Sequence, residues 1–565
     1  MRSVLVAVIA IWALVAQTPV PAPQETQAER FRSSGALQLV DEFVARQMRQ
    51  DRTPGVALAI TSRDALMMVS TYGFADVRAR VPLTPSHLFE IGSISKSFTA
   101  VALLQQRDAG RFDPAAPIVK SLPWFSVQSK FEPTTGHQLL THTAGFPRDR
   151  DDVPSSLYQA AALHERTIVA KPGTRYAYSN VGYQVLGYAL AAIAGRPYPE
   201  VVRDGILLPL GMTVTEPQFT HDTRLRLAVG YEDMYDDRPP HVSHPLAPAT
   251  WLEYGAGDGS IASTAEDMAA YVRMLLNKGR GPSGPVISPE SFALLTQKAV
   301  KIGDAQWYGY GMRVSEIEGR TVLSHSGGMV GYASSLLADV TDGVGVIVMV
   351  NGPGSSDAIA SFALDAGRAV AKGSTLPSQP APNDPSIVPN AADYAGEYKS
   401  ESGAPLVIVA DANRLWLVHR GVRVLLESRG RDRFFVNHPD YALFLLTFTR
   451  DADKQVTEAS WGDRWFVGSR YKGLAAVAPP ESWRAFVGHY RTTHAWFSNF
   501  RIVLRKGQLL LISPSGGEQV MIPVGDEFAL EDKDSAERIT FDTIVNGTAL
   551  RVTLSGVPYY RSFTP

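Results

Sequence analysis

Cysteine is absent from the chain of 565 residues. Its absence excludes disulfide bonds, thiolate zinc sites, iron–sulfur clusters and a cysteine nucleophile. An excess of one charge is also missing, because 54 lysine and arginine residues are balanced by 56 aspartate and glutamate residues. We therefore expect no field of one sign that could hold nucleic acid or an anionic membrane surface. With 45% hydrophobic and 19% charged residues, the composition is that of a folded globular protein.

Long hydrophobic runs are missing beyond the first residues. Arg2 is followed by an uncharged, largely apolar run, residues 4–16, and then by a polar, proline-rich stretch, residues 17–27. The run is too short to span a bilayer but has the length of the hydrophobic region of an export signal. We expect an export signal and tail over residues 1–27, and a periplasmic or secreted protein without an integral membrane segment. A buried N-terminal helix is the alternative.

Two proline-rich stretches are candidate linkers in a chain that is too long for one compact core. They cover residues 373–390 and 475–482. These stretches predict a main domain over residues 28–372 and two smaller domains over residues 391–474 and 483–565.

The two C-terminal segments resemble each other. Residues 394–398 read YAGEY and residues 486–490 read FVGHY, and further matching pairs follow at a nearly constant offset. Such self-similarity indicates an internal duplication. Each copy is a series of short apolar strands separated by turns, and closure of the strands into a barrel removes exposed strand edges. We therefore expect two small antiparallel β-barrels whose interiors are filled by side chains.

The main domain begins and ends with strand patterns and has helices between them. Ser263 and Glu266 form a predicted capping box for the last of these helices. This order predicts an α+β fold in which N-terminal and C-terminal strands meet in one antiparallel sheet. The expected helices cover residues 36–48, 94–109, 181–194 and 265–277, and the expected strands cover residues 56–61, 67–72, 312–317, 321–325, 332–339 and 344–350.

Ser93 and Lys96 form the first candidate catalytic group. They are three residues apart at the start of a predicted helix, so their hydroxyl and amine share one face. The residues that follow are apolar on nearly every side, which indicates a buried helix, and burial disfavours a charged ammonium. An uncharged Lys96 can act as a general base that activates Ser93. The alternative is a helix cap beside a surface lysine, because this spacing also occurs by chance.

Tyr178 and Asn180 form a second candidate group, directly before the predicted helix over residues 181–194. A tyrosine hydroxyl can pass the proton of Ser93 to a leaving group, and Asn180 can donate a hydrogen bond to the substrate or contact the lysine. In the alternative interpretation, Tyr178 packs in the core and Asn180 caps the helix.

His325 begins a third candidate group and is followed by Ser326, Gly327 and Gly328 at the end of a predicted strand. The glycines allow a substrate backbone to approach closely. The histidine can donate a hydrogen bond, or carry a positive charge, toward a substrate carbonyl or carboxylate. A purely structural histidine is the alternative.

The three groups occur in the order found in serine β-lactamases and penicillin-binding proteins. Residues 36–370 resemble the class C branch of this superfamily. The resemblance implies a β-lactamase/transpeptidase-like body, with an antiparallel sheet flanked by helices plus a helical subdomain, followed by the two β-barrels. It implies Ser93 as the acyl-accepting nucleophile, Lys96 and Tyr178 as the base system, and Asn180 and His325 as further site residues. The supporting stretches are FEIG at 89–92, LLTHTAG at 139–145, STAEDM at 263–268 and SHSGGM at 324–329.

The resemblance also implies an oxyanion hole that contains the backbone N–H of Ser93 and a second N–H from the strand after the third group. We expect that strand at residues 331–334, with Ser334 and Gly327 contacting the substrate. Many relatives carry Lys-Thr-Gly where this chain has His325-Ser326-Gly327. A histidine is a poorer partner than a lysine for the β-lactam carboxylate, so efficient β-lactam hydrolysis is disfavoured. The His-x-Gly form is similar to D-aminopeptidases, in some relatives of which a lipocalin-like barrel follows and a barrel loop reaches the cleft.

We therefore expect a serine hydrolase that forms an acyl-enzyme and cleaves amide bonds in short peptides, including peptides with D-residues. The expected partner is a small peptide or ester substrate, with no metal, no cofactor and no nucleic acid. One alternative is a carboxylesterase or weak β-lactamase with the same site. The non-enzymatic alternative is a binder or sensor of peptidoglycan fragments.

Overall fold

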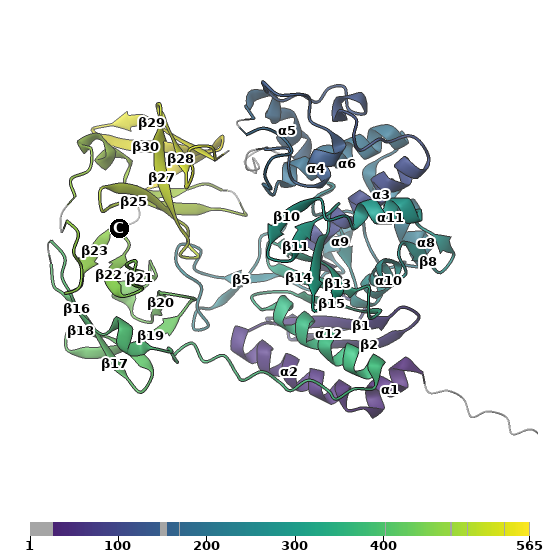
Figure 1. Cartoon of the computed structure of the whole chain (residues 1–565), viewed down its shortest axis with the longest axis horizontal. Coiled ribbons are helices and arrows are strands. Elements are labelled where there is room, and N and C mark those ends of the chain that lie inside the picture. Colours follow the sequence, from purple (N-terminus) through teal and green to yellow (C-terminus); the bar gives the residue numbers. More distant parts are fainter. Residues whose placement is uncertain are drawn as a thin grey trace, which may run out of the picture.

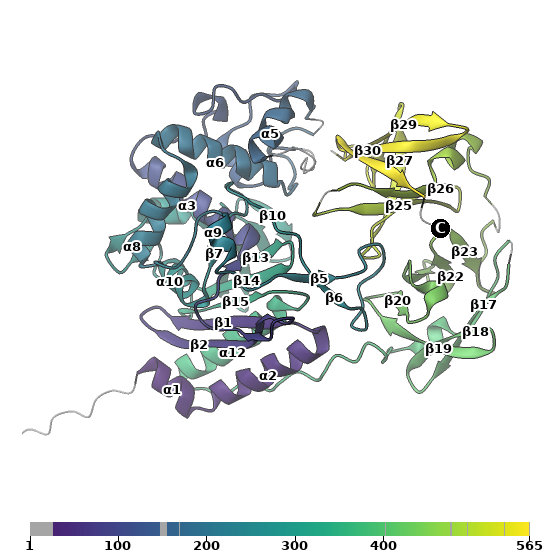
Figure 2. The same ribbon diagram turned by 180° about the vertical axis from the view of Figure 1, so that it is seen from behind.

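A computed structural model describes residues 26–146, 155–168, 170–401, 403–474, 477–493, 495–535 and 537–563. Most of the predicted export signal and tail lies outside the described residues. The mixed body lies on one side of the molecule, and two barrels lie one above the other on the opposite side (Figures 1 and 2). None of the described helices is long and apolar enough to cross a bilayer.

An antiparallel sheet of nine described strands runs through the body, in the order β10-β11-β12-β13-β14-β15-β1-β2-β3. Strand β1 pairs with β15, with Val56 opposite Val350, so that N-terminal and C-terminal strands meet as predicted. Both strands are buried along their whole length, which explains their continuous apolar sequences. The strands are β1 (Gly55–Ser62), β2 (Leu66–Asp76), β3 (Val81–Pro82), β10 (Val300–Gly303), β11 (Gln306–Tyr308), β12 (Arg313–Ile317), β13 (Arg320–Met329), β14 (Tyr332–Asp339) and β15 (Val344–Val350).

Helices cover both faces of this sheet. On one face lie α1 (Gln27–Ser33), α2 (Ala36–Asp51) and α12 (Ser356–Lys372), where Phe43 stacks on Phe362 at 4.2 Å between ring centroids. On the other face lie α3 (Ser95–Asp108) and α10 (Ala265–Leu276), in a second apolar cluster. Beyond α3, the helices α4 (Gly136–Leu140), α5 (Ser156–Ala161) and α6 (Asn180–Ala194) form a helical layer above the sheet (Figure 1). The α+β body with a helical subdomain agrees with the prediction.

The predicted cap of α10 is wrong by one residue. Thr264 is the N-cap, and its hydroxyl accepts a hydrogen bond from the backbone N–H of Asp267 at 3.2 Å. Ser263 instead forms a hydrogen bond with Thr215 at 2.7 Å between hydroxyl oxygens. The reason is that residues 262–263 still form a short strand, β7 (Ala262–Ser263), which pairs with β4 (Phe89–Glu90) directly before Ser93.

Each C-terminal segment forms an antiparallel barrel of eight strands, as predicted. The second barrel closes through pairing of its first and last strands, and the first closes through Lys399 and Val467, whose backbones exchange bonds of 2.9 and 2.8 Å. Apolar side chains are buried inside both. The first comprises β16 (Gly396–Tyr398), β17 (Leu406–Asp411), β18 (Arg414–His419), β19 (Val422–Ser428), β20 (Arg433–Val436), β21 (Leu446–Arg450), β22 (Val456–Trp461) and β23 (Arg464–Val467). The second comprises β24 (Gly488–Arg491), β25 (Asn499–Arg505), β26 (Gln508–Ile512), β27 (Glu518–Val524), β28 (Glu527–Leu530), β29 (Arg538–Val545), β30 (Thr548–Leu554) and β31 (Val557–Ser562).

One hydrogen bond occurs at the same place in both barrels. The hydroxyl of Tyr398 donates to the carbonyl oxygen of Tyr394 at 2.8 Å, and the hydroxyl of Tyr490 donates to that of Phe486 at 2.8 Å. These four residues are the matched positions of the two repeated segments. The shared bond supports the proposal that the barrels arose by duplication.

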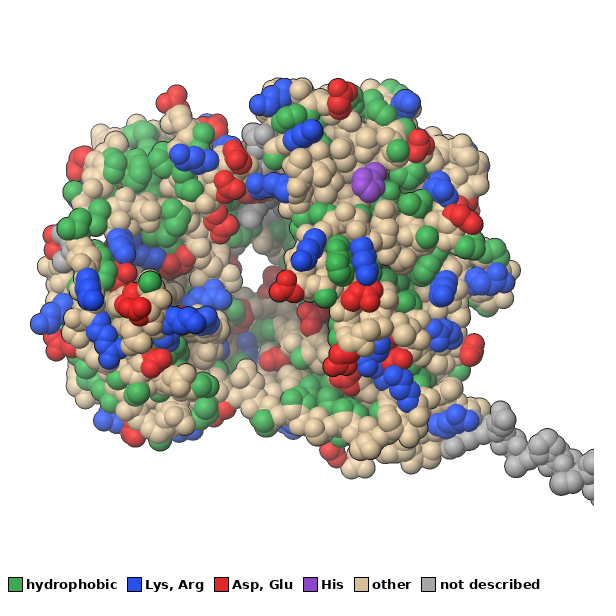
Figure 3. Space-filling view, viewed as in Figure 1, with side chains coloured by type: hydrophobic (Ala, Val, Ile, Leu, Met, Phe, Trp, Pro, Cys, Tyr) green, Lys and Arg blue, Asp and Glu red, His purple; other side chains and the backbone are tan. Residues whose placement is uncertain are grey.

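Both barrels contact a protrusion of the body that follows β5 (Tyr231–Asp233). Asp236 accepts hydrogen bonds from Arg491, from the Ser498 hydroxyl at 3.0 Å and, at its carbonyl, from Asn499 at 3.0 Å. His241 stacks on Phe435 of the first barrel at 4.3 Å between ring centroids. Figure 3 shows an opening that remains between the body and the barrels, with acidic side chains along its edge.

Candidate active site

Ser93 lies in a single 3-10 turn, η1 (Gly92–Ile94), that leads directly into α3. Gly92 has a φ of +52°, which an L-residue adopts only with strain. A Cβ atom there would also lie 2.7 Å from the carbonyl oxygen of Gly328. Glycine at this position therefore allows the nucleophile turn to contact the end of β13 closely.

Lys96 is fully buried beneath Ser93 in the first turn of α3. Its Nζ lies 3.0 Å from Ser93 Oγ, 2.7 Å from Asn180 Oδ1 and 2.8 Å from the carbonyl oxygen of Asp258. The amide and carbonyl oxygens can only accept protons, whereas a hydroxyl can also donate. An uncharged amine would therefore donate to Asn180 and Asp258 and direct its lone pair at the Ser93 hydroxyl.

Two hydroxyls of α3 fix the loop that contains Asp258. Ser95 Oγ accepts a hydrogen bond from the N–H of Ile261 at 3.2 Å, and Thr99 Oγ1 donates to the carbonyl oxygen of Gly257 at 2.6 Å. These two hydroxyls therefore hold one loop, and that loop supplies the third contact of the lysine.

Tyr178 approaches the lysine through its ring. Lys96 Nζ lies 5.0 Å from the ring centroid, and the tyrosine side chain is 41% exposed. The ring also lies 4.2 Å from that of the buried His142 and 6.5 Å from that of His325, measured between centroids. Tyr178 is therefore at the open side of the site. Asn180 is the first residue of α6, directly after the N-cap Ser179, and contacts Lys96 from there.

Two buried histidines are joined by Tyr308 into one chain of hydrogen bonds. The N–H of Ser179 donates to His142 Nδ1 at 3.1 Å, so His142 Nε2 carries the proton that points at the Tyr308 hydroxyl, 3.2 Å away. Tyr308 in turn lies 3.0 Å from His325 Nε2, and His325 Nδ1 lies 2.7 Å from the carbonyl oxygen of Ser326. Since that carbonyl only accepts, His325 carries its proton on Nδ1 and accepts from Tyr308 at Nε2.

His325 is therefore not positioned as expected from the sequence. It is 2% exposed, both ring nitrogens are occupied, and it does not line the pocket that contains Ser93. Burial lowers the pKa of His325 to about 3, and the nearby charge of Arg313 makes a smaller contribution in the same direction. Burial likewise holds the pKa of His142 well below its usual value. The uncharged His325 is a positioning group for its strand rather than a positive charge offered to the substrate.

Gly327 and Ser334 also lie outside the pocket that contains Ser93. The Ser334 hydroxyl is buried and donates to the carbonyl oxygen of Ile91 at 2.9 Å, and a Cβ on Gly327 would overlap the same oxygen. Both residues thus support the segment before the nucleophile from behind. The residues of β13 that line the pocket are Gly328 and Met329, and residues 331–334, where a second oxyanion donor was expected, are not among its described lining.

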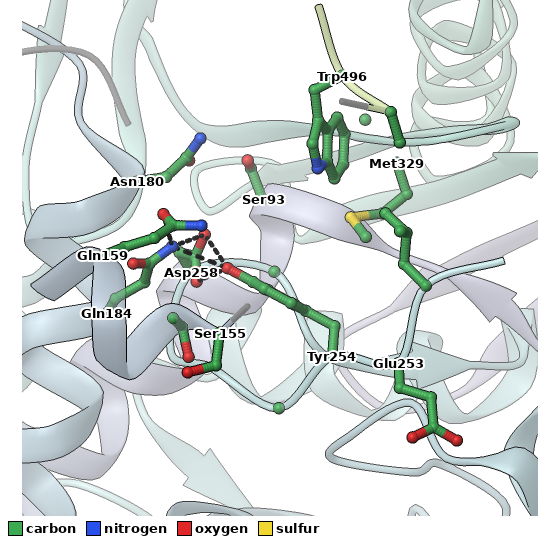
Figure 4. A pocket seen from close by; sticks show the side chains of 16 residues that line it. Ser93, Ser155, Gln159, Asn180, Gln184, Glu253, Tyr254, Asp258, Met329 and Trp496 are labelled. Carbon is green, nitrogen blue, oxygen red and sulfur yellow. Dashed lines mark hydrogen bonds between the residues drawn. The ribbon is translucent and has the colours of Figure 1, made fainter. Parts of the chain in front are cut away.

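A pocket of about 330 Å³ opens beside Ser93. Figure 4 shows Ser93 and Asn180 near its top, Asp258, Gln184, Gln159 and Tyr254 grouped below, and Trp496 beside Met329 at the other side. Trp496 and Ala495 belong to the loop between β24 and β25, so the second barrel contributes part of the pocket wall.

Three features of this pocket were not predicted from the sequence. Asp258 follows a glycine-rich run, residues 255–257, which could have indicated a close approach to another backbone. Gln184 has the helical position of a core residue, four after Asn180. Trp496 has no local signal, because its place depends on how the second barrel contacts the body.

A group of potential metal ligands lies elsewhere in the described part of the chain. Ligand atoms of His419, His438 and Asp440, in the first barrel, lie within 4.8 Å of one another. The N–H of Asp440 donates to His438 Nδ1 at 3.1 Å, and Arg420 lies 3.4 Å from the Asp440 carboxylate. The arginine charge and the occupied nitrogen make this group a poor cation site.

Comparison with known proteins connects the fold to one family. The family model described as Beta-lactamase matches residues 40–369. "Protein flp" of Staphylococcus aureus is 25% identical over 336 residues, which cover 56% of this chain and 64% of the relative. The chain thus spans less than two thirds of that protein. "Penicillin-binding protein 4" of Amycolatopsis lactamdurans is 26% identical over 379 residues, which cover 63% of this chain and 96% of the relative.

Solved structures show the same fold. The octameric penicillin-binding protein homologue from Pyrococcus abyssi has a TM-score of 0.56 and 24% identity, and the match covers 76% of this chain and 99% of that one. The beta-lactamase/D-alanine carboxypeptidase from Pseudomonas syringae has a TM-score of 0.50 and 18% identity, with 58% and 98% covered. At these sequence identities, the two comparisons show a shared fold and nothing more.

Proposed function

The chain belongs to the beta-lactamase family, and from that premise we propose that it is a serine hydrolase with Ser93 as nucleophile and Lys96 as general base. The observation that supports this most is the 3.0 Å contact between Ser93 Oγ and the Nζ of a fully buried lysine. This contact places the amine where, in its uncharged form, it can accept the serine proton.

The proposed reaction has two halves. In the first, Lys96 accepts the proton of Ser93 while Oγ forms a bond to the substrate carbonyl carbon, whose oxygen gains the electron pair. Collapse of this intermediate breaks the bond to the leaving amine, which receives the proton through Lys96 and the hydroxyl of Tyr178. In the second, water attacks the acyl-enzyme, and the reverse proton transfer releases the acid and restores Ser93.

The backbone N–H groups of Ser93 and Gly328 are the proposed oxyanion donors. Gly328 faces Gly92 across a gap that admits no side chain, and its own Cβ direction is open to the pocket. In this proposal, the two N–H groups hold the negative oxygen of the tetrahedral intermediate. This role replaces the one that the sequence suggested for residues 331–334.

Amides of short peptides are the proposed substrates. The pocket is small, its wall is completed by Trp496, and the third group carries an uncharged His325 where many relatives carry lysine. A carboxylate is therefore not attracted by that residue, which disfavours β-lactams. Esters are the second candidate. An alcohol is a better leaving group than an amine, so acyl transfer from an ester depends less on proton donation by Tyr178.

A parallel assay tests the proposal. Wild type and Ser93→Ala are compared on D- and L-aminoacyl amides, p-nitrophenyl esters and a chromogenic cephalosporin. We expect turnover of amides and esters that is lost in Ser93→Ala, with little turnover of the cephalosporin. Turnover of esters alone would replace the peptidase by an esterase. If no compound is turned over and no serine probe labels the protein, the proposed hydrolase activity is refuted. The alternative of a non-enzymatic binder of peptidoglycan fragments is then favoured.

We also propose that the protein is exported. This proposal is supported only by the first residues of the sequence, where the charged Arg2 precedes an apolar run over residues 4–16. N-terminal sequencing of the protein from its native cell envelope tests this. A mature chain that begins near residue 17 supports export, and one that still carries Arg2 refutes signal cleavage.

A further inference from the structure

A second pocket, of about 650 Å³, adjoins the pocket that contains Ser93. One wall is the protrusion of the body that follows β5, and the other is formed by loops of the second barrel at residues 491–493, 495–499 and 513–515. Figure 1 shows β5 extending from the body toward the barrels. Trp496 lines both pockets, so the two pockets meet at its side chain.

The charges that line the second pocket are paired, with one exception. The ion pairs are Arg491–Asp236, Arg238–Asp237 and Arg52–Asp233. Glu232 is exposed in the same lining and forms no ion pair with any residue that the structure describes. The pocket therefore offers one free carboxylate, which can accept hydrogen bonds from two neighbouring hydroxyl groups of a ligand.

Three threonine hydroxyls of the same lining are also available. Thr250 and Thr493 are exposed and Thr492 is half-buried, and none of their hydroxyls forms a hydrogen bond within the described ranges. A hydroxyl can both donate and accept. Together with Glu232, these groups suit a ligand that is rich in uncharged donors and acceptors.

Aromatic rings are exposed at this pocket. Trp496 is 46% exposed and Tyr235 is 41% exposed. Figure 4 shows the indole of Trp496 at the edge of the pocket that contains Ser93. Ligand pockets combine aromatic side chains with a few placed polar groups. A sugar matches this combination, because its ring has apolar C–H groups on its faces and hydroxyl groups at its edge.

An extended peptide is a poorer match for the second pocket. The strands that flank the loop of Trp496 are hydrogen-bonded on both edges, β24 to β25 and β31, and β25 to β24 and β26. Neither strand therefore has a free edge to which a peptide backbone could add as a further strand.

The acyl portion of a substrate would point toward this pocket. Tyr178, the proposed proton donor to the leaving group, is not among the described lining of the pocket between Ser93 and Trp496. The leaving group therefore extends toward Tyr178, and the acyl portion extends toward Trp496 and the second pocket.

We propose that the second pocket binds a sugar carried by the acyl portion of the substrate, with Trp496 against the face of the sugar ring and Glu232 accepting from its hydroxyl groups. The inference rests on the proposed function and narrows the substrate to glycosylated esters or amides. The bond that Ser93 attacks lies in the first pocket, so the sugar itself is not altered by the reaction.

Sugar binding is measured first, on Ser93→Ala, by NMR titration with maltotriose, cellotriose and the trisaccharide of N-acetylglucosamine. We expect at least one of them to bind with a millimolar or lower dissociation constant. Adding Glu232→Ala should weaken this binding about tenfold, because hydrogen bonds to a charged group are lost. The matched control is Glu253→Ala, which removes an exposed carboxylate that lines only the first of the two pockets and should leave the affinity unchanged. No binding of any trisaccharide up to about 10 mM, or equal affinities with and without Glu232→Ala, would overturn the inference.

Paired substrates then test the role of the sugar in turnover. p-Nitrophenyl 4-hydroxybutanoate and 6-hydroxyhexanoate, with glucose or N-acetylglucosamine on the hydroxyl, are compared with the same esters carrying a methyl group there. We expect kcat/KM to be about tenfold higher for a glycosylated ester at one or both chain lengths. This preference should be lost in Glu232→Ala and retained in Glu253→Ala. Equal values within every pair would overturn the inference.

The two measurements separate this inference from the proposed function. Sugar binding to Ser93→Ala does not require catalysis, so it can succeed when the proposed function fails. If wild type hydrolyses none of the esters and no serine probe labels it, the proposed function fails. If the methyl-capped esters are hydrolysed as well as the glycosylated ones, only the present inference fails.

Discussion

Burial of uncharged histidines is the feature of single residues that shapes this site most. His325 and His142 each have both nitrogens in the hydrogen-bond chain that passes through Tyr308. Protonation of either would place a second donor against a group that already donates and would bury a charge near Lys96 and Arg313. This chain of hydrogen bonds therefore holds β13 against the helical layer only while both histidine rings are uncharged.

A pH-dependent stability follows for His325. Burial lowers its pKa to about 3 in the folded state from 6.5, so the unfolded chain binds more protons between these values. The contribution of the uncharged His325 to the free energy of unfolding is complete above about pH 6.5. It is lost as the pH falls toward 3, by up to about 1.4 kcal/mol per pH unit. Urea unfolding at pH 7.5 and 4.5 is expected to give a smaller pH difference for His325→Gln than for wild type. His221→Gln, at an exposed position, is the control that should retain the wild-type difference.

At the scale of elements, the site depends on close contact between the nucleophile turn and β13. Gly327 is packed against the carbonyl of Ile91, whereas the Cβ direction of Gly328 has no atom within 4 Å. Two neighbouring glycines of one strand thus have opposite tolerance for a side chain. Only the first is required by packing.

Alanine substitutions test this difference. Gly327→Ala is expected to lower the free energy of unfolding by roughly 1–3 kcal/mol, because the added methyl group must displace the backbone before Ser93. Gly328→Ala should stay within about 1 kcal/mol of wild type. Denaturant unfolding measures both, and equal losses would contradict the packing described here.

Periodicity and local motifs predicted the elements that carry the site. Helices α3 and α6 and strand β13 have local signals, since apolar spacing and the positions of Ser93, Asn180 and His325 are read within single segments. The sequence did not indicate that His325 faces inward, because that depends on Tyr308 of β11 and His142 after α4. Contacts between distant segments, such as Asp258 beneath Lys96, likewise have no signal in either segment alone.

At the scale of the whole molecule, the second barrel completes the pocket. Asp236 of the body binds Arg491, Ser498 and Asn499, which flank the loop that carries Trp496. The barrel thereby places Trp496 in the pocket wall, and we expect it to limit the size of the group that can enter. The resemblance to relatives with barrel loops suggested this possibility, but the residues were not readable from the sequence.

Removal of the indole is expected to widen the acceptance of substrates. In Trp496→Ala, the ratio of kcat/KM for p-nitrophenyl octanoate over p-nitrophenyl acetate should rise about tenfold, because the pocket gains length. Asp236→Ala should change the ratio in the same direction, since the loop loses its anchor. Trp124→Ala, an exposed tryptophan outside the pocket lining, is the control. A constant ratio in Trp496→Ala would mean that the barrel does not restrict the substrate.

Acylation of Ser93 by way of Lys96 is the claim on which the other proposals depend, and mass spectrometry of the trapped acyl-enzyme tests it most directly. Protein quenched during turnover of a p-nitrophenyl ester is digested with trypsin, which releases residues 81–96 as one peptide. We expect an acyl group on Ser93 in that peptide, none in Ser93→Ala, and acylation slowed by about a thousandfold in Lys96→Met. An acyl group on another residue, or undiminished acylation of Ser93→Ala, would contradict it.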